Sequence, residues 1–377
     1  MSKGQGTAIL FTILWPVAFL VAQTRLAVPR PSFATLSAQA AAARDSEHLD
    51  SAATLYREAL ALNTGWTEGW WSLGTIEYDL NNYRQAASAF EKLCMLDSKA
   101  GSARIMLGLS EFELGEDKDA LTHIQEGERI GVADNQQLRN VALYHEGVLL
   151  QRQGKFEGSE RALDSLCIAG VETPELSAVL GMVALRLRDR VAPTEAPGAE
   201  IFRRAGHAQC LAAQKEFDEG RREYTALVRD FPQFPKVHYA FGRFLLDAHE
   251  TRAGITELET EIELHPEDSM ARLQIAAAKY KIDSEGALPY AQAAVEHDPA
   301  QPLGHYLLGL LLLDTGNYRR AITELETAQR SMSEVANIYS ALGAAYSQAG
   351  RDEDAARARA TLQHLSRGSA TSQAPLP

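Results

Sequence analysis

The sequence has 377 residues, of which 45% are hydrophobic and 23% are charged, a composition typical of a folded soluble protein rather than a disordered one. Its 50 acidic residues outnumber its 37 basic residues, which argues against nonspecific nucleic-acid binding because that requires a basic surface. Three widely spaced cysteines, Cys94, Cys167 and Cys210, predict no disulfide framework.

An apolar run covers residues 8–22, close behind Lys3. It contains Pro16 and is shorter than the roughly 20 residues of a membrane-spanning helix. A charged start, an apolar centre and a polar end predict a secretory signal, with an uncleaved membrane anchor or a buried core segment as alternatives. We expect residues 1–24 to be a signal peptide or anchor and 25–32 to be a linker. The remaining chain would then be exported (periplasmic or extracellular) or anchored to the membrane.

From residue 33 onward, a period of 34 residues organises the sequence. Three pairs show this spacing, namely Gly74 with Gly108, Pro232 with Pro266, and Gly309 with Gly343. Around several of these glycines the chain has a Leu-Gly pair, then a turn, then a second predicted helix that carries alanine. Such self-similarity indicates a stacked repeat protein.

The repeated pattern resembles the tetratricopeptide repeat family. In the repeat that starts at Pro302, Leu308, Gly309 and Ala321 stand at the family's positions 7, 8 and 20. Small residues at positions 8 and 20 let two antiparallel helices approach closely. The resemblance implies an all-α fold, a right-handed superhelical solenoid of about ten helix-turn-helix repeats behind the N-terminal hydrophobic segment. One repeat alone cannot bury its apolar face, so the repeats must stack.

Repeat starts are expected near residues 33, 67, 101, 140, 174, 201, 235, 269, 302 and 336. Five extra residues, 135–139, precede the start at Asn140. The repeat at Pro174 has a predicted first helix over 175–189, but the sequence that follows is too broken for a second helix.

That broken sequence, VAPTEAPGAE at residues 191–200, contains two prolines and a glycine. It predicts either a hinge between two arrays, 33–190 and 201–369, or a surface loop on one continuous superhelix. Both interpretations stay open. The polar tail, 370–377, is expected to be disordered.

No catalytic or metal-binding motif stands out. The ten histidines form no HExxH motif, and the sequence has neither a GxxxxGK[ST] phosphate loop nor a GxSxG elbow. Packing or solvation is the favoured interpretation of His123, His238 and His305, with a ligand role as the alternative. Glu257 and Glu261 are expected on a solvated helix face. The repeats leave no room for a catalytic domain, so we expect no enzyme, cofactor or metal site.

The resemblance places a ligand-binding groove along the first helices, mainly at positions 2, 5, 9 and 12 of each repeat. The predicted groove residues are Trp71, Ile105, Leu109, Tyr144, Tyr239, Arg243, Leu273, Tyr306 and Leu310. For the position-12 residues Tyr78, Phe112, Tyr280 and Leu313, packing against the neighbouring first helix is the favoured role, with a groove role as the alternative. Trp71 and Thr75 replace the Lys and Asn with which some family members clamp acidic chain ends, so we expect an apolar or amphipathic ligand.

The sequence therefore predicts a scaffold that binds a peptide or amphipathic helix of a partner protein, in an envelope or secretory context. One alternative is a self-assembling structural protein, in which an apolar face or terminal repeat buries against another copy. A second alternative is an enzyme that the repeats support. Nucleic acid is not an expected partner, whereas a homo-oligomer and a membrane tether through residues 8–22 are open possibilities.

Overall fold

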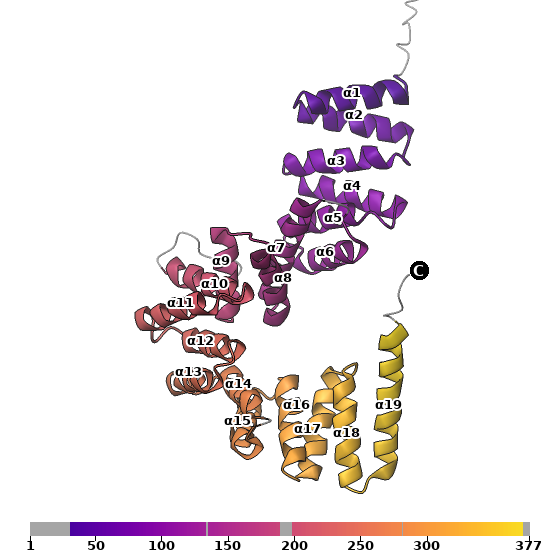
Figure 1. Cartoon of the computed structure of the whole chain (residues 1–377). Coiled ribbons are helices and arrows are strands. Elements are labelled where there is room, and N and C mark those ends of the chain that lie inside the picture. The colour runs from indigo at the N-terminus through magenta and orange to yellow at the C-terminus, as the bar shows by residue number, and fades with distance from the viewer. Residues whose placement is uncertain (1–30, 133–134, 189–197, 281, 372–377) are drawn as a thin grey trace, which may run out of the picture.

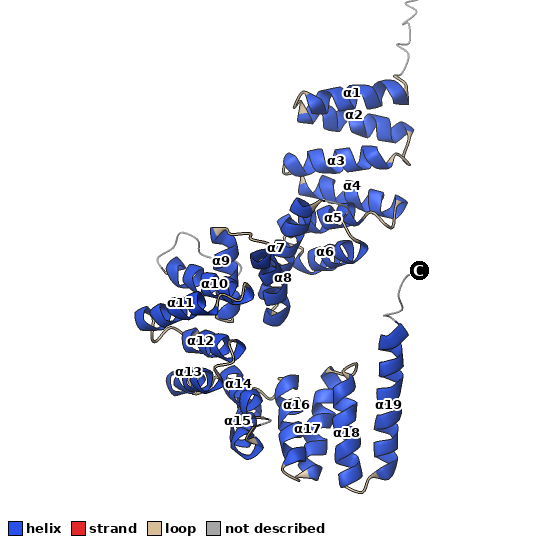
Figure 2. Cartoon of the chain, viewed as in Figure 1, coloured by secondary structure: helices blue, strands red, loops and turns tan. Residues whose placement is uncertain are grey.

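The computed structural model describes residues 31–132, 135–188, 198–280 and 282–371, with side chains described as far as residue 367. Within these ranges it contains nineteen α-helices and no β-strand (Figure 2). No described helix is both long and apolar enough to cross a bilayer. The predicted signal or anchor at 1–24 and most of the predicted linker lie outside the described residues.

The helices follow one another as antiparallel hairpins (Figure 1). The N-terminal helices are α1 (Phe33–Asp45), α2 (Leu49–Leu62), α3 (Thr67–Asp79), α4 (Tyr83–Leu96), α5 (Gly101–Glu113), α6 (Asp117–Ile130), α7 (Gln136–Arg152), α8 (Phe156–Ile168) and α9 (Pro174–Ala184). The C-terminal helices are α10 (Ala199–Ala213), α11 (Phe217–Asp230), α12 (Val237–Asp247), α13 (Thr251–Leu264), α14 (Ser269–Lys279), α15 (Ser284–His297), α16 (Pro302–Asp314), α17 (Tyr318–Ser331), α18 (Ala336–Gln348) and α19 (Asp352–Thr371).

The 34-residue period fixes where most hairpins begin. The starts predicted at 33, 67, 101, 174, 269, 302 and 336 are each the first residue of a helix. Those predicted at 201 and 235 differ from the observed starts by two residues. The all-α solenoid expected from the sequence is therefore confirmed.

Two details of the prediction are corrected. Residues 136–139 do not precede a helix but form the first turn of α7. Asn135 caps this turn, because its side chain accepts a hydrogen bond from the backbone N–H of Leu138 at 2.9 Å. At the other end of the molecule, α19 continues through residues 370–371, which were expected in the disordered tail. Residues 372–377 lie outside the described residues.

The third correction concerns α9, which ends at Ala184 rather than at residue 189 and does have an antiparallel partner. That partner is α10, which contacts α8, α9, α11 and α12. Glycines on both helices make the close approach possible, since a Cβ added to Gly181 would lie 1.8 Å from the carbonyl oxygen of Phe202. A Cβ on Gly206 would lie 1.7 Å from the carbonyl oxygen of Ser177. Residues 189–197, which include most of the predicted hinge or loop, lie outside the described residues.

The core is distributed along the stack, in separate apolar clusters rather than one centre. The cluster around Tyr56 and Leu73 joins the first two hairpins, and the cluster around Leu308 and Leu342 joins the last ones. Each hairpin therefore depends on its immediate neighbours, as in other solenoids. Figure 1 shows the stack bending near α7–α10 and again near α14–α16, so that the molecule forms an open arc.

Candidate protein-binding face

Four of the nine predicted groove residues lie in the core. Ile105, Leu109, Tyr239 and Leu273 are between 0% and 7% exposed. They stand on first helices, as expected, but neighbouring helices cover their side chains. A side chain covered to this extent offers no surface to a ligand, so these four residues support the stack instead.

The other five, Trp71, Tyr144, Arg243, Tyr306 and Leu310, are partly exposed. Arg243 is committed to an ion pair inside the protein, because its two terminal nitrogens each lie 3.2 Å from a carboxyl oxygen of Glu160. Trp71 and Tyr144 remain on the N-terminal half, and Tyr306 and Leu310 remain on the C-terminal half.

Trp71 and Tyr144 are the two ends of a continuous row of partly exposed side chains on α3, α5 and α7, which we name the N-terminal aromatic face. Its members are Trp71, Tyr78, Met106, Phe112 and Tyr144. Trp71, Tyr78 and Met106 pack against one apolar cluster, and Tyr78, Met106 and Phe112 pack against the next. Phe112 and Tyr144 share a third. These residues therefore follow the first helices from repeat to repeat, each half inside the core and half outside it.

The two tyrosines of this face both have a raised pKa. Burial, with Glu113 nearby, raises the pKa of Tyr78 to about 12. Burial, with Glu175 nearby, also raises the pKa of Tyr144. Both phenols therefore stay neutral at physiological pH and can donate a hydrogen bond to a ligand. Phe112 and Tyr78, for which packing was the favoured role, do pack against neighbouring first helices, but each also keeps part of its ring exposed.

A similar but shorter apolar row lies on the C-terminal half. Tyr280, Tyr306, Leu310 and Leu313 are partly buried and pack against a single cluster formed by α14–α19. Burial raises the pKa of Tyr306. Lys279 places its ammonium nitrogen 5.5 Å from the ring centre of Tyr290, which packs against the same cluster.

Two histidines hold hairpins together in the same way. His238 Nδ1 lies 2.7 Å from Glu257 and its Nε2 lies 3.1 Å from the carbonyl oxygen of Pro232. His305 repeats the arrangement with Glu324 at 2.6 Å and Pro299 at 2.9 Å. In His238 both ring nitrogens face acceptors, and the hydrogen bond to Glu257 is the main cause that raises its pKa.

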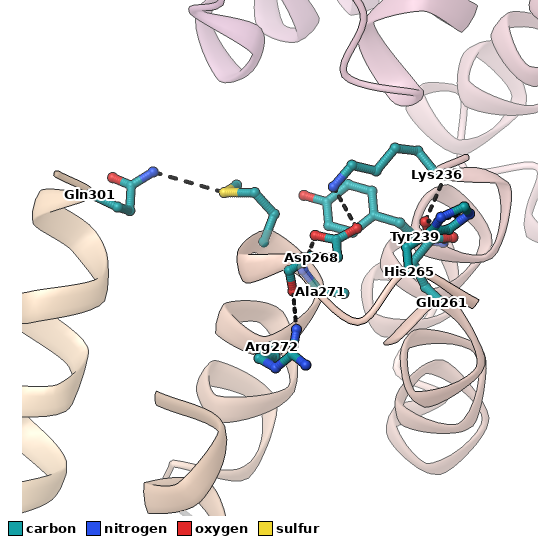
Figure 3. Close-up of polar contacts among 9 residues, drawn as sticks. Lys236, Tyr239, Glu261, His265, Asp268, Ala271, Arg272 and Gln301 are labelled. Atoms are coloured by element: carbon teal, nitrogen blue, oxygen red, sulfur yellow. Dashed lines mark hydrogen bonds and ion pairs between the residues drawn. The ribbon is translucent and has the colours of Figure 1, made fainter. Parts of the chain in front are cut away.

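The expectation that Glu257 and Glu261 lie on a solvated face is therefore wrong. Glu261 is only 1% exposed and accepts hydrogen bonds from the backbone N–H groups of Lys236 at 2.8 Å and Tyr239 at 3.2 Å, at the start of α12 (Figure 3). Asp268 caps the start of α14 in a similar way, because its side chain accepts a hydrogen bond from the backbone N–H of Ala271 at 3.0 Å. These buried carboxylates satisfy helix ends that would otherwise lack partners, so their role is structural.

A denser polar network lies where α8, α10 and α12 meet, a region we name the junction. Glu160 of α8 binds Arg243 of α12 and accepts a hydrogen bond from Gln209 of α10 at 2.9 Å. Asp164 lies beside this network, and burial, followed by the charge of Glu160, raises its pKa to about 7. The Oδ1 atom of Asp164 has no hydrogen-bond partner among the described residues.

The junction also overturns the cysteine prediction. Cys167 of α8 and Cys210 of α10 form a disulfide, with their Cα atoms 5.4 Å apart. The two cysteines are 43 residues apart in sequence, so their spacing did not indicate the contact. They meet because α9 reverses the chain direction between α8 and α10. Cys94 is a free, partly buried thiol. Within the described part of the chain, no group of three or more His, Cys, Asp or Glu side chains is arranged to hold a metal ion.

These features define a class before any comparison: a helical-hairpin solenoid whose buried polar groups are structural and whose exposed apolar groups follow the first helices. A family model described as tetratricopeptide repeat matches residues 72–131 and 306–366. These two regions therefore carry tetratricopeptide repeats, as the sequence resemblance implied, and that family is in general a non-catalytic, protein-interaction scaffold.

No curated protein matches the chain. Among solved structures, MamA from Desulfovibrio magneticus RS-1 is 22% identical, with 44% of this chain and 94% of that chain covered and a TM-score of 0.41. The hetero-tetramer Cut9-Hcn1 of the APC/C is 13% identical, with 89% and 88% covered and a TM-score of 0.37. A tetratricopeptide repeat protein from Parabacteroides merdae ATCC 43184 is 15% identical, with 74% and 98% covered and a TM-score of 0.35. Likeness at this level carries no inference about function.

Proposed function

We propose that this protein is a scaffold that captures a peptide or an amphipathic helix of another protein on its row of first helices. The observation that carries the proposal is the N-terminal aromatic face, where five large side chains stay partly exposed across three successive repeats. Trp and Tyr side chains of this kind supply most of the affinity at protein interfaces. An apolar helix face that docks on such a row matches the helix-in-groove mode of recognition.

Binding would be non-covalent and non-catalytic. The partner would cover the exposed ring surface of Trp71 and Tyr144 and gain about 25 cal/mol for each Å² of apolar surface removed from water. The buried halves of the same rings are fixed by the core clusters, so little side-chain freedom is lost on binding.

The test is capture of partners by the full chain and by variants with Trp71→Ala or Tyr306→Ala. Capture of the same partner should weaken in at least one variant, because each substitution removes a ring from one of the two rows. Circular dichroism should show the same helicity in all three proteins. Unchanged capture by both variants, with helicity intact, would contradict the proposal.

We also propose that the scaffold works outside the cytoplasm, exported or tethered by residues 8–22. The apolar run supports this, and so does the Cys167–Cys210 disulfide, because disulfides persist mainly in oxidising compartments. Residues 1–32 fused to a reporter enzyme that folds only after export should give reporter activity. An inactive but stable fusion would argue against export.

Self-assembly is a second candidate, and one observation favours it. Leu62, Met95 and Leu96, at the ends of α2 and α4, are between 48% and 67% exposed. A second copy of the chain could cover these residues. Light scattering of the fragment 33–377 over a range of concentrations tests this, and a monomer at all concentrations would remove the candidate.

A further inference from the structure

We propose that the partner of the N-terminal aromatic face is a basic amphipathic segment, in which Lys or Arg side chains lie beside the apolar anchors. This inference rests on the proposed function, since it names the chemistry of the ligand for the same face. Three observations carry it: the charge of the first repeats, the position of two acidic residues, and an internal example of the expected contact.

The negative charge of the protein is concentrated at its N-terminal end. Residues 31–132, which form α1–α6, contain 16 acidic and 8 basic residues. Residues 135–188, which form α7–α9, contain 6 of each. More than half of the net charge of −13 therefore lies on α1–α6, the repeats that contain α3 and α5. Such a potential attracts cationic ligands and repels acidic ones.

Two acidic residues occupy unfavourable places at the edge of this face. Asp79 is the last residue of α3 and Glu113 is the last residue of α5, and both are exposed. The carboxyl end of a helix carries partial negative charge, so an anion there is destabilised unless a cation lies close by. Neither helix has a basic residue in its last turn, and neither carboxylate forms an ion pair with a described residue.

Two other first helices that end in an acidic residue, α1 and α12, have such a cation. Asp45, the last residue of α1, pairs with Arg44 at 2.9 Å. Asp247, the last residue of α12, lies within electrostatic reach of Arg243 and Lys215. Among the described first helices of the N-terminal half, the unmatched negative charge is therefore found at α3 and α5, and in the C-terminal half Asp314 at the end of α16 also lacks a described basic partner.

Tyr78 connects the two acidic residues to the aromatic face. It lies one position before Asp79 on α3, and both Glu113 and Asp79 act on its hydroxyl group. Its ring lies 5.3 Å from the ring of Tyr83. An aromatic ring next to two carboxylates is a favourable site for an ammonium or guanidinium group, because the ring face attracts cations as well.

The neighbouring helix α7 shows this arrangement completed from within the chain. Arg152, in the last turn of α7, lies 4.7 Å above the ring of Phe112 and pairs with Asp117 at 3.1 Å. The guanidinium thus joins a ring of the aromatic face to a carboxylate. At the ends of α3 and α5, the ring of Tyr78 and the carboxylates of Asp79 and Glu113 are present without a cation from the described residues. We infer that the partner supplies it.

The first experiment selects ligands with the full chain. A display library of peptides about 14 residues long has apolar residues fixed at i, i+3, i+4 and i+7, with all other positions random. Bound peptides should be enriched in Lys and Arg over Asp and Glu. One selected peptide is then titrated against the wild type and the double variant D79N/E113Q at low and moderate salt.

The double variant should bind the selected peptide about tenfold more weakly at low salt, since two exposed charge contacts are lost. The difference should shrink as salt screens exposed charges. The matched control is D314N/E353Q, which removes the same charge. Asp314 is the last residue of α16 and has only the hydroxyl group of Ser284, at 3.5 Å, as a partner. This control should change affinity by less than twofold.

Three results would overturn the inference. Enrichment without a basic bias, with binding still lost in Trp71→Ala, would leave the proposed function standing and remove the basic partner. Equal weakening in D79N/E113Q and D314N/E353Q would show attraction by overall charge alone. No enrichment at all would also overturn it, while the capture experiment with Trp71→Ala and Tyr306→Ala judges the proposed function separately.

Discussion

The junction and the N-terminal aromatic face are built from the same hairpins but use their polar and aromatic residues in opposite ways. In the junction, Glu160 meets Arg243 and Cys167 meets Cys210, so the strongest interactions are made within the chain. On the face, aromatic rings stay partly exposed beside Asp79 and Glu113, which have no cation of their own. The difference suggests a division of work: the junction holds the arc together, and the face leaves its interactions for a partner.

This division predicts that variants of the two regions affect different properties, either stability or affinity. Removing the ion pair or the disulfide of the junction should lower stability and leave affinity for a selected peptide nearly unchanged. Changes on the face should do the reverse. The predictions below run from the largest expected effect to the smallest.

Arg243→Ala should have the largest effect. It leaves the carboxylate of Glu160 buried without its charged partner, which costs about 3–5 kcal/mol in the free energy of unfolding. Arg222→Ala is the matched control, because its pair with Glu219 is exposed and is worth about 1 kcal/mol or less. Thermal and urea unfolding measure both. Equal losses would remove the special role given to the junction.

Removing the disulfide should have the next largest effect. The double variant C167S/C210S should lose about 2–4 kcal/mol, as expected for a cross-link between residues 43 apart. Cys94→Ser, which changes only the free thiol, should lose much less. Mass spectrometry after alkylation checks the premise, since the unreduced wild type should take up one alkyl group. Uptake of three would contradict the disulfide itself.

Glycine substitutions test the packing of α9 on α10. Gly181→Ala should destabilise by about 1–3 kcal/mol, because the added carbon would lie 1.8 Å from a backbone oxygen. Gly343→Ala in α18 should be neutral or stabilise by up to about 1 kcal/mol, since the nearest atom to its added carbon is 3.6 Å away. The two melting temperatures should therefore move in different directions. A harmless Gly181→Ala would mean that the two helices are farther apart.

Asp164→Asn should have the smallest effect, and one that depends on pH. Burial is the main cause that raises the pKa of Asp164 from 3.8 to about 7, so its protonated form favours the folded state. That contribution is fully present below the unfolded pKa and is lost as pH rises through about 7. The variant should match the wild type near pH 4 and be more stable by about 1–2 kcal/mol at pH 8.5. The same difference at both pH values would contradict this assignment.

Sequence reasoning reached the fold because the period of 34 is a local property. The Leu-Gly pair at Leu308 and Gly309 sits where two helices touch, so spacing alone places the hairpins. It missed the Cys167–Cys210 disulfide and the Glu160–Arg243 pair because both join helices that are not consecutive, and the second spans 83 residues. Such contacts depend on how α9 and α10 fold back on each other, which the repeat pattern does not encode.

The candidate site was only half predictable for a related reason. Repeat positions identify which residues stand on first helices, and Trp71 and Tyr144 were found in this way. They do not specify how closely the next helix covers each residue, so Ile105 and Tyr239 occupy comparable positions and are fully buried. The unmatched charges of Asp79 and Glu113 were also missed, because an acidic residue at a helix end looks ordinary until its surroundings are known.

Site-specific photo-crosslinking tests the central claim most directly. A photoreactive amino acid replaces Thr75, which is partly exposed on α3 between Trp71 and Tyr78, or Gln363, which is exposed on α19. If the N-terminal aromatic face is the binding surface, a bound peptide or partner should crosslink from position 75 and not from position 363. Crosslinks from 363 alone, or from both positions equally, would contradict the account.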